Sequence, residues 1–444
     1  MISNIRNRLI VLYHSVISSI ALYPSLIATG LFLLSLGLLW VEGNTDLARD
    51  LQPRLPYLIT QDGSTVRVLL STLIGGVISL TVFSFSMVMI VLNQASSNFS
   101  PRLLPGLISD KRNQVVLGVY IGTIIFNLLI LINLPAEGPE QLEMGLTILA
   151  GIILGVLCLV LFIFFIHNVS TSIQVQNIIN NIYLMTRERL HYQISKERRE
   201  SPPIQGDLAP WHPIYSDRAG YFEDVDLTRL RHLASEYQTD LKVVPYKGKY
   251  LLPNELTVYS SQPLDEAQTS NVLGALLFTG LRKPSSNYMY GIQEIVEVGV
   301  KAMSPGINDP GTAVMTIDYL TELLSLRMQL DALEVHATED QAHQIELTTI
   351  SFAELLHQTL SAYRLYCRHD VILMEKLLRM LAYLRRSRTI DPQHHKILEE
   401  QMAVFAEDLQ EHISNEKDRA RLLRLLPDAF SGAPENQGEG LGEF

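Results

Sequence analysis

The sequence predicts a membrane protein made of two unlike parts: four transmembrane α-helices, followed by an α+β, mostly helical, water-soluble region that we expect in the cytoplasm. Three observations predict this class. Four long segments near the start are apolar and uncharged. The chain has 444 residues, more than one typical domain of roughly 150 residues. Its hydrophobic residues, 47% of the total, gather in the N-terminal part.

The four apolar segments cover residues 22–41, 68–92, 115–134 and 146–166. A helix needs about 20 residues to cross a hydrocarbon core of about 30 Å. None of the segments contains Asp, Glu, Lys, Arg or His. The first is too long for a cleaved signal sequence and lacks a small-residue cleavage site, so we expect it to be retained. Residues 1–166 are therefore predicted to form a four-helix transmembrane domain.

The distribution of lysine and arginine predicts the orientation, because short cytoplasmic loops carry the positive charges. Arg6 and Arg8 precede the first segment, and Lys111 and Arg112 lie between the second and third. Five more positive residues follow the fourth segment, whereas residues 135–145 carry only glutamates. The loop between the first and second segments carries both positive and negative residues, so its charge does not indicate a side. Both termini are predicted to be cytoplasmic.

The second segment carries small and polar residues at helical spacing: Thr72, Gly75, Gly76, Ser79, Ser86 and Asn93. Four of these recur every seven residues and so share one narrow helix face. One interpretation is that this face lines a water-filled pore at the centre of a homo-oligomer. The alternative is that the small residues let helices approach closely and form hydrogen bonds.

A Ser-Pro-Arg sequence follows the second segment. Ser100 suits a helix N-cap and Pro101 the first helical position, with Arg102 next. A short helix is predicted to begin here, with leucines on one side. It is interpreted either as a lever joining the second and third spans or as a plain connector.

The chain after the fourth segment is predicted to contain five further parts, each with its own residue pattern. Helical periodicity continues through residues 167–200, where the stripe that includes Ile179 and Ile182 suits either a contact between subunits or packing on the soluble region. A proline-rich linker covers 201–213. Residues 214–262 are predicted to form a small α+β module, with strands at 221–222, 241–244, 249–252 and 256–259 and a helix at 226–236. A helical domain covers 263–426, and a disordered tail covers 427–444.

The sharpest local motif is Ser-Pro-Gly-Ile-Asn-Asp-Pro-Gly-Thr-Ala at 304–313. Its candidate hinge or gating residues are Pro305, Gly306, Asn308, Asp309, Pro310 and Thr312. Pro305 and Gly306 are typical of a helix end, while Asp309 followed by Pro310 is typical of a helix start. A tight helix-loop-helix corner explains this pattern. Alternatively, the oxygens of Asn308, Asp309 and Thr312 bind a cation or contact the membrane half, although one carboxylate is a weak metal signal.

Several functional classes find no support in the sequence. The net charge of −11 argues against nucleic acid as a partner. Two cysteines, Cys158 and Cys367, do not make a disulfide framework. There is no phosphate-binding glycine loop, zinc spacing or nucleophile elbow. We therefore expect neither enzyme activity nor catalytic residues, a metal or a cofactor.

The four spans, Ser100-Pro101-Arg102 and the Asn-Asp-Pro motif together resemble a bacterial membrane family, domain of unknown function 2254. The likeness extends over nearly the whole chain before the tail, and it includes Phe165-Ile166-His167 and Gly220-Tyr221. It implies a multi-pass protein of the bacterial inner membrane without an assigned reaction. Asn168 follows His167 where a second histidine is expected, which weakens the idea of a histidine metal pair.

Two functional hypotheses follow. The first is an oligomeric ion channel lined by the second span and gated by the cytoplasmic domain, since copies can pool one uncharged polar helix each around an axis. The second is a non-conducting scaffold or sensor whose soluble region binds a partner or ligand. The lipid bilayer and further copies of the chain are the expected partners, and any ion or small ligand is left open.

Overall fold

The computed structural model describes residues 21–45, 63–98, 111–134, 144–172, 174–197, 211–278, 287–331 and 333–427. Contacts divide the chain into two compact units, Met1–Asn177 and Ile178–Phe444. Each unit is described by itself.

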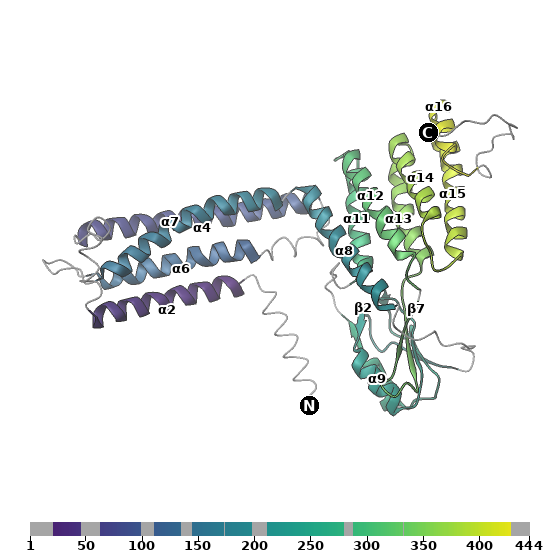
Figure 1. Cartoon of the computed structure of the whole chain (residues 1–444), viewed down its shortest axis with the longest axis horizontal. Coiled ribbons are helices and arrows are strands. Elements are labelled where there is room, and N and C mark those ends of the chain that lie inside the picture. The colour runs from purple at the N-terminus through teal and green to yellow at the C-terminus, as the bar shows by residue number, and fades with distance from the viewer. Residues whose placement is uncertain are drawn as a thin grey trace. The chain divides into compact units, whose positions relative to one another are not determined.

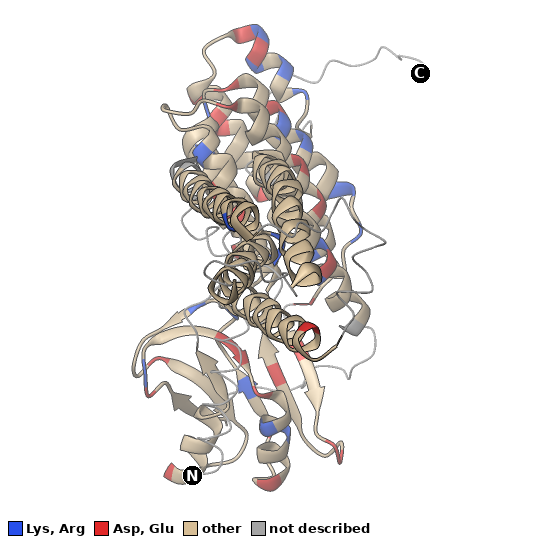
Figure 2. Ribbon diagram, turned by 90° about the vertical axis from the view of Figure 1, so that its left-hand side faces the viewer, with Lys and Arg blue, Asp and Glu red and all other residues tan. Residues whose placement is uncertain are grey.

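The first unit contains four long helices: α2 (Leu22–Asn44), α4 (Gly63–Asn98), α6 (Lys111–Asn133) and α7 (Gly145–Ser172) (Figure 1). All four are long and apolar enough to cross a membrane. Figure 2 shows that their ribbons carry almost no charged residues, whereas charges are spread over the second unit. The four predicted spans are confirmed, and each helix is longer than its apolar segment.

Helices α2 and α6 lie very close together because glycines stand between them. A Cβ atom on Gly118 would lie 2.9 Å from the Cα of Pro24, and one on Gly122 would lie 2.5 Å from Leu31. Contacts this short leave no room for a side chain. Small residues at helix crossings are the usual means of tight packing in membranes, where apolar burial alone favours no particular partner.

The second unit includes all but the first turn of α8 (Val175–Glu197) and contains two sheets, the larger mixed and the smaller antiparallel. The larger sheet has the strand order β1-β5-β3-β8-β7, and the smaller has the order β4-β2-β6. Their bounds are β1 (His212–Tyr215), β2 (Gly220–Val225), β3 (Leu241–Val243), β4 (Tyr250–Leu251), β5 (Leu256–Ser260), β6 (Leu276–Phe278), β7 (Leu333–Ala337) and β8 (Gln344–Thr348). Helices α9 (Leu227–Glu236) and α10 (Glu266–Leu273) belong to the same α+β part.

The larger sheet joins segments that are about a hundred residues apart in sequence. Strands β3 and β8 pair in parallel with Lys242 opposite Glu346, while the other neighbours in this sheet are antiparallel. The Lys242 ammonium lies 3.0 Å from the buried Glu346 carboxylate. A buried carboxylate needs such a partner, so this pair favours one register.

The remaining helices pack beside one another at the other end of the unit (Figure 1). They are α11 (Tyr288–Ala302), α12 (Pro310–Arg327), α13 (Phe352–Cys367), α14 (Val371–Arg386), α15 (Gln393–His412) and α16 (Glu416–Leu423). Gly299 of α11 faces Tyr363 and Thr316, whose hydroxyls are 2.7 Å apart. A glycine is required there, since a Cβ atom would lie 2.0 Å from the Tyr363 hydroxyl.

The structure changes three predicted boundaries. The helical stretch 167–200 is two helices, because α7 ends at Ser172 and α8 starts at Val175. The segment assigned to the linker already contains the start of β1, and residues 201–210 lie outside the described part. The module 214–262 is incomplete by itself, because β6, β7 and β8 come from the segment expected to be helical. The predicted tail, apart from Pro427, lies outside the described residues.

Candidate functional site

Helix α4 has two opposite faces that both follow a seven-residue spacing. Leu70, Val77, Ser84 and Val91 are at most 8% exposed and face the rest of the unit. The predicted series of Thr72, Ser79, Ser86 and Asn93 is exposed throughout. The two series are offset by two residues, which is roughly 200° around a helix. The predicted polar face therefore points away from the other three helices.

This outer face of α4 has no neighbour among the described residues. Cβ atoms built on Gly75 and Gly76 would meet nothing within 4 Å. The Gly75–Ser79 pair therefore does not serve helix packing within the protomer. The face is flanked by large exposed apolar side chains, including Val82, Phe85 and Ile90, which suit lipid.

The hydroxyl groups of this face are oriented by the helix itself. Thr72 donates its hydroxyl hydrogen to the Val68 carbonyl at 2.8 Å, and Ser79 donates to the Gly75 carbonyl at 2.9 Å. Each hydroxyl has a single hydrogen, so what it presents outward is an oxygen lone pair. Thr72 and Ser79 therefore present acceptors on the outer face. The predicted connector residues Ser100, Pro101 and Arg102 lie outside the described residues.

The Asn-Asp-Pro motif forms the predicted helix-loop-helix corner. Helix α11 ends at Ala302, whose carbonyl accepts from the Asp309 backbone N–H at 2.7 Å, and α12 starts with Pro310. Pro305 and Gly306 are exposed in the turn between them. Asn308 has a φ of 48°, in the left-handed region that asparagine tolerates. The turn is compact and faces solvent.

Asp309 is the N-cap of α12. Its carboxylate accepts from the Thr312 backbone N–H at 3.1 Å and from the Thr312 hydroxyl at 2.6 Å. These hydrogen bonds lower the pKa of Asp309. Both oxygens are therefore already engaged by the chain, which favours the corner over the cation site among the two interpretations. Within the described residues, no group of three or more metal-ligating side chains forms.

Replacing Asp309 by alanine is expected to destabilise the second unit by about 1 kcal/mol, since a helix loses its N-cap. Asp309→Asn keeps the accepting oxygen and should lose much less. Because the folded-state pKa is depressed, the charge contributes above the ordinary carboxyl pKa, and its contribution disappears as the pH falls through the folded value. Thermal unfolding of the full chain at neutral and acidic pH measures this. Equal losses for both variants would contradict the capping role.

Helix α8 is held on α11 and α12 by buried and polar contacts. Ile179 and Ile182 are at most 4% exposed, so their stripe packs on the second unit, the second of the two predicted alternatives. Glu322 of α12 accepts from the Tyr183 hydroxyl at 2.5 Å and from the Arg187 guanidinium at 2.7 Å. Burial opposes ionisation of Glu322, but these hydrogen bonds outweigh it and lower its pKa. The rings of Tyr183 and Tyr319 stack at 4.3 Å.

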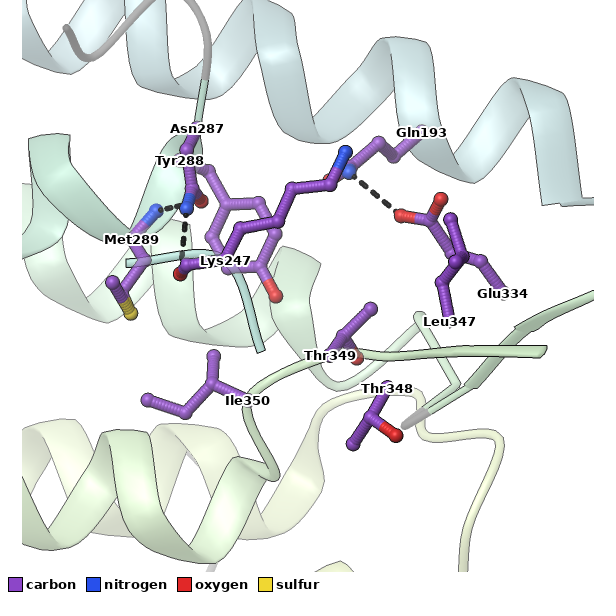
Figure 3. Close-up of a pocket in the computed structure, with 10 residues that line it drawn as sticks. All are labelled: Gln193, Lys247, Asn287, Tyr288, Met289, Glu334, Leu347, Thr348, Thr349 and Ile350. Carbon is purple, nitrogen blue, oxygen red and sulfur yellow. Dashed lines mark hydrogen bonds between the residues drawn. The ribbon is translucent and has the colours of Figure 1, made fainter. Parts of the chain in front are cut away.

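A small cavity lies among α8, the N-terminus of α11 and the ends of β7 and β8 (Figure 3). Gln193 donates to Glu334 at 3.2 Å, and the Asn287 amide donates to the Lys247 carbonyl at 3.0 Å. The Lys247 ammonium is paired with Asp224 at 2.7 Å. The space is only about 20 Å³, enough for one or two water molecules. We assign no ligand to it.

Helix α14 carries several positive residues, and three of them are paired with carboxylates. Lys376 lies 2.5 Å from Asp318, Arg379 lies 2.8 Å from Glu375, and Arg385 lies 3.4 Å from Glu399. Paired surface charges offer little attraction to anionic lipid. This arrangement supports a solvated face.

The sequence did not point to one buried carboxylate in the first unit. Glu42, near the end of α2, is 4% exposed and accepts from the Leu146 backbone N–H at 2.6 Å at the start of α7. It also accepts from the backbone N–H and hydroxyl of Thr147. The carboxylate thus caps a helix that begins about a hundred residues later. In the sequence, the only sign of this capping role is that a glutamate follows a long apolar segment. Many exposed glutamates occupy the same kind of position, so the pattern does not identify a buried one.

The comparisons with known proteins agree with the membrane architecture. The family described as "Predicted membrane protein (DUF2254)" matches residues 17–383. An uncharacterised protein of Mycobacterium bovis and one of Mycobacterium tuberculosis are each 26% identical over 367 residues, covering 79% of this chain and 68% of theirs. No solved structure matches the chain. The family match covers both the four spans and most of the second unit, and the chain therefore belongs to the DUF2254 family of predicted membrane proteins.

Proposed function

We propose that this membrane protein is an oligomeric ion channel of the bacterial inner membrane, in which the outer face of α4 from several copies surrounds a pore. The observation that carries the proposal is the exposure of Thr72, Gly75, Gly76, Ser79 and Ser86 on the side of α4 away from its own bundle. Polar side chains facing lipid gain nothing, whereas copies arranged around an axis give them a common aqueous surface.

The orientation of the hydroxyls favours cations as the permeant ions. Thr72 and Ser79 donate their hydrogens to their own helix and leave oxygen lone pairs on the outer face. A ring of neutral oxygens replaces part of an ion's hydration shell without binding it too tightly to leave. An anion would require donors at the same positions.

The second unit is proposed to act as the gate. Helix α8 follows the last span in the chain and is bonded to α12 through Tyr183, Arg187 and Glu322. Helix α12 starts at the exposed Asn-Asp-Pro corner. A ligand or partner that moves α12 would therefore pull on the segment that leads into the membrane. The predicted cytoplasmic location of both termini belongs to this proposal.

Ion flux into liposomes containing the purified full-length protein tests the channel. Ser86→Leu places a large apolar side chain on the pore face and is expected to lower monovalent cation flux at least about tenfold. Phe85→Leu, at the neighbouring exposed apolar position, is the matched control and should leave flux unchanged. Equal fluxes for both variants would exclude a pore lined by α4.

The same outer face also suits close, dry packing between copies, because Gly75 and Gly76 have no side chains to separate two helices. In that case the protein is a non-conducting scaffold or sensor. An oligomer that Gly76→Leu dissociates, combined with wild-type liposomes as impermeable to cations as empty ones, would favour this alternative.

A further inference from the structure

Polar side chains run through the interior of the first unit, on the opposite side of α4 from its outer face. These residues are at most 6% exposed, in a part of the protein where polar groups are costly to bury. They come from all four helices: Glu42, Ser84, Gln114, Tyr120, Thr123, Asn127, Thr147, Cys158 and Asn168. We call this set the polar column.

The two ends of the column lie at the two ends of the bundle. At one end, the Glu42 carboxylate bonds to Leu146 and Thr147 at the start of α7. At the other end, Asn168 of α7 donates to Asn113 of α6 at 2.9 Å. Thr147 and Asn168 are 21 residues apart on one helix, which corresponds to roughly 31 Å. The column therefore spans about the thickness of a hydrocarbon core.

Between the ends, the polar groups follow each other along α6 and α7. Cys158 donates to the Thr123 hydroxyl at 3.4 Å, and the buried hydroxyls of Tyr120 and Ser84 have no hydrogen-bonding partner among the described residues. One turn from Thr123, the Asn127 amide points to the Gly151 carbonyl at 3.5 Å. The longest step along α6, from Tyr120 to Gln114, is roughly 9 Å by helix rise, which equals the length of a chain of about three hydrogen bonds.

Four atoms in the column show that the described side chains do not complete the network. Ser84 Oγ, Gln114 Oε1, the Tyr120 hydroxyl oxygen and Asn127 Oδ1 are fully buried and have no hydrogen-bond partner among the described groups. A buried acceptor without a partner is strongly unfavourable inside a bilayer, where lipid offers none. Water molecules inside the bundle supply the missing donors in such cases.

We propose that the polar column of each protomer holds a file of water molecules and conducts protons across the membrane, independently of the pore between protomers. Each water or hydroxyl accepts a proton on one side and releases another on the opposite side. The net change is one proton moved from the first solution to the second, with no other reactant. Hydrated metal cations do not pass through the column. They need a wider path, and the column offers them only neutral groups between its ends.

Proton flux into liposomes tests this proposal. The full-length protein is reconstituted with a pH-sensitive dye inside, and a potassium gradient with valinomycin provides the driving voltage. Wild-type protein should carry protons faster than protein-free liposomes. Asn127→Leu is expected to reduce the flux about tenfold, the factor that one lost hydrogen bond contributes to a rate.

Two further variants keep the test decisive. Thr123→Val removes a hydroxyl at constant shape, and it should show the same loss even if Asn127→Leu fails to fold. Ser86→Leu, on the outer face of α4, should leave proton flux unchanged while it blocks the proposed cation pore. The proposal is overturned if the wild-type proton flux equals that of empty liposomes. It is also overturned if proton flux is lost in Ser86→Leu but retained in Thr123→Val. Neither result tests whether the cation pore exists.

Discussion

Replacing Arg327 by methionine is expected to destabilise the second unit by about 3 kcal/mol, because two buried backbone carbonyls lose their donor. Arg327 is 1% exposed at the end of α12. Its guanidinium donates to the Leu330 carbonyl at 2.6 Å and to the Ile350 carbonyl at 2.5 Å. Methionine retains most of the side-chain volume but none of the donors. Chemical denaturation of the full chain in detergent measures the loss.

Two companion variants show whether geometry or charge is responsible. Arg327→Lys keeps the charge, but one ammonium does not reproduce the planar fork that reaches both carbonyls, so it should recover less than half of the loss. Arg421→Met removes an exposed arginine paired with Glu375 at 3.1 Å, and a surface pair of this kind is worth less than about 1 kcal/mol. Equal effects at both positions would show that Arg327 has no special role.

Replacing Gly291 by alanine is expected to loosen α8 from α11 and to lower stability by about 2 kcal/mol. A Cβ atom there would lie 1.8 Å from the Thr186 hydroxyl and 2.9 Å from the Thr186 Cβ. Rotating the threonine side chain does not move its Cβ atom, which is itself too close, so the helices must separate. The thermal unfolding temperature should fall by roughly 4 to 8 °C for a unit of this size.

The double variant Thr186→Ala with Gly291→Ala isolates the contact. Removing the threonine hydroxyl and methyl relieves the shortest overlaps, so the double variant should be more stable than Gly291→Ala alone. Gly306→Ala is the neutral control, since a Cβ atom there meets nothing within 4 Å. If Gly291→Ala unfolds at the wild-type temperature, the close packing of α8 on α11 is wrong.

Local sequence signals predicted the parts of the structure that depend on near neighbours. The four spans follow from continuous hydropathy, and the α12 start follows from Asp309 and Pro310, which act within three residues. The strands at β3, β4 and β5 follow from alternating apolar residues between turn residues. Strand β8 also alternates, but its buried Glu346 reads as a surface residue until Lys242 is known to lie beside it.

For the candidate pore face of α4, too, the sequence predicted only what depends on near neighbours. The seven-residue spacing of Thr72, Ser79 and Ser86 establishes that they share a helix face, because helix geometry is local. Whether that face is covered depends on where α6 and α7 lie, and no pattern within α4 contains this information. The structure alone shows the face to be exposed among the described residues.

The sequence by itself determined a membrane protein with four spans, a C-terminal α+β region rich in helices, and a capped helix corner at residues 304–313. Only the tertiary structure decided which residues distant in sequence meet: Glu42 with the start of α7, Lys242 with Glu346, and Thr186 with Gly291. Hydropathy and capping act over a few residues, whereas these contacts join segments about a hundred residues apart and depend on how whole helices and strands pack.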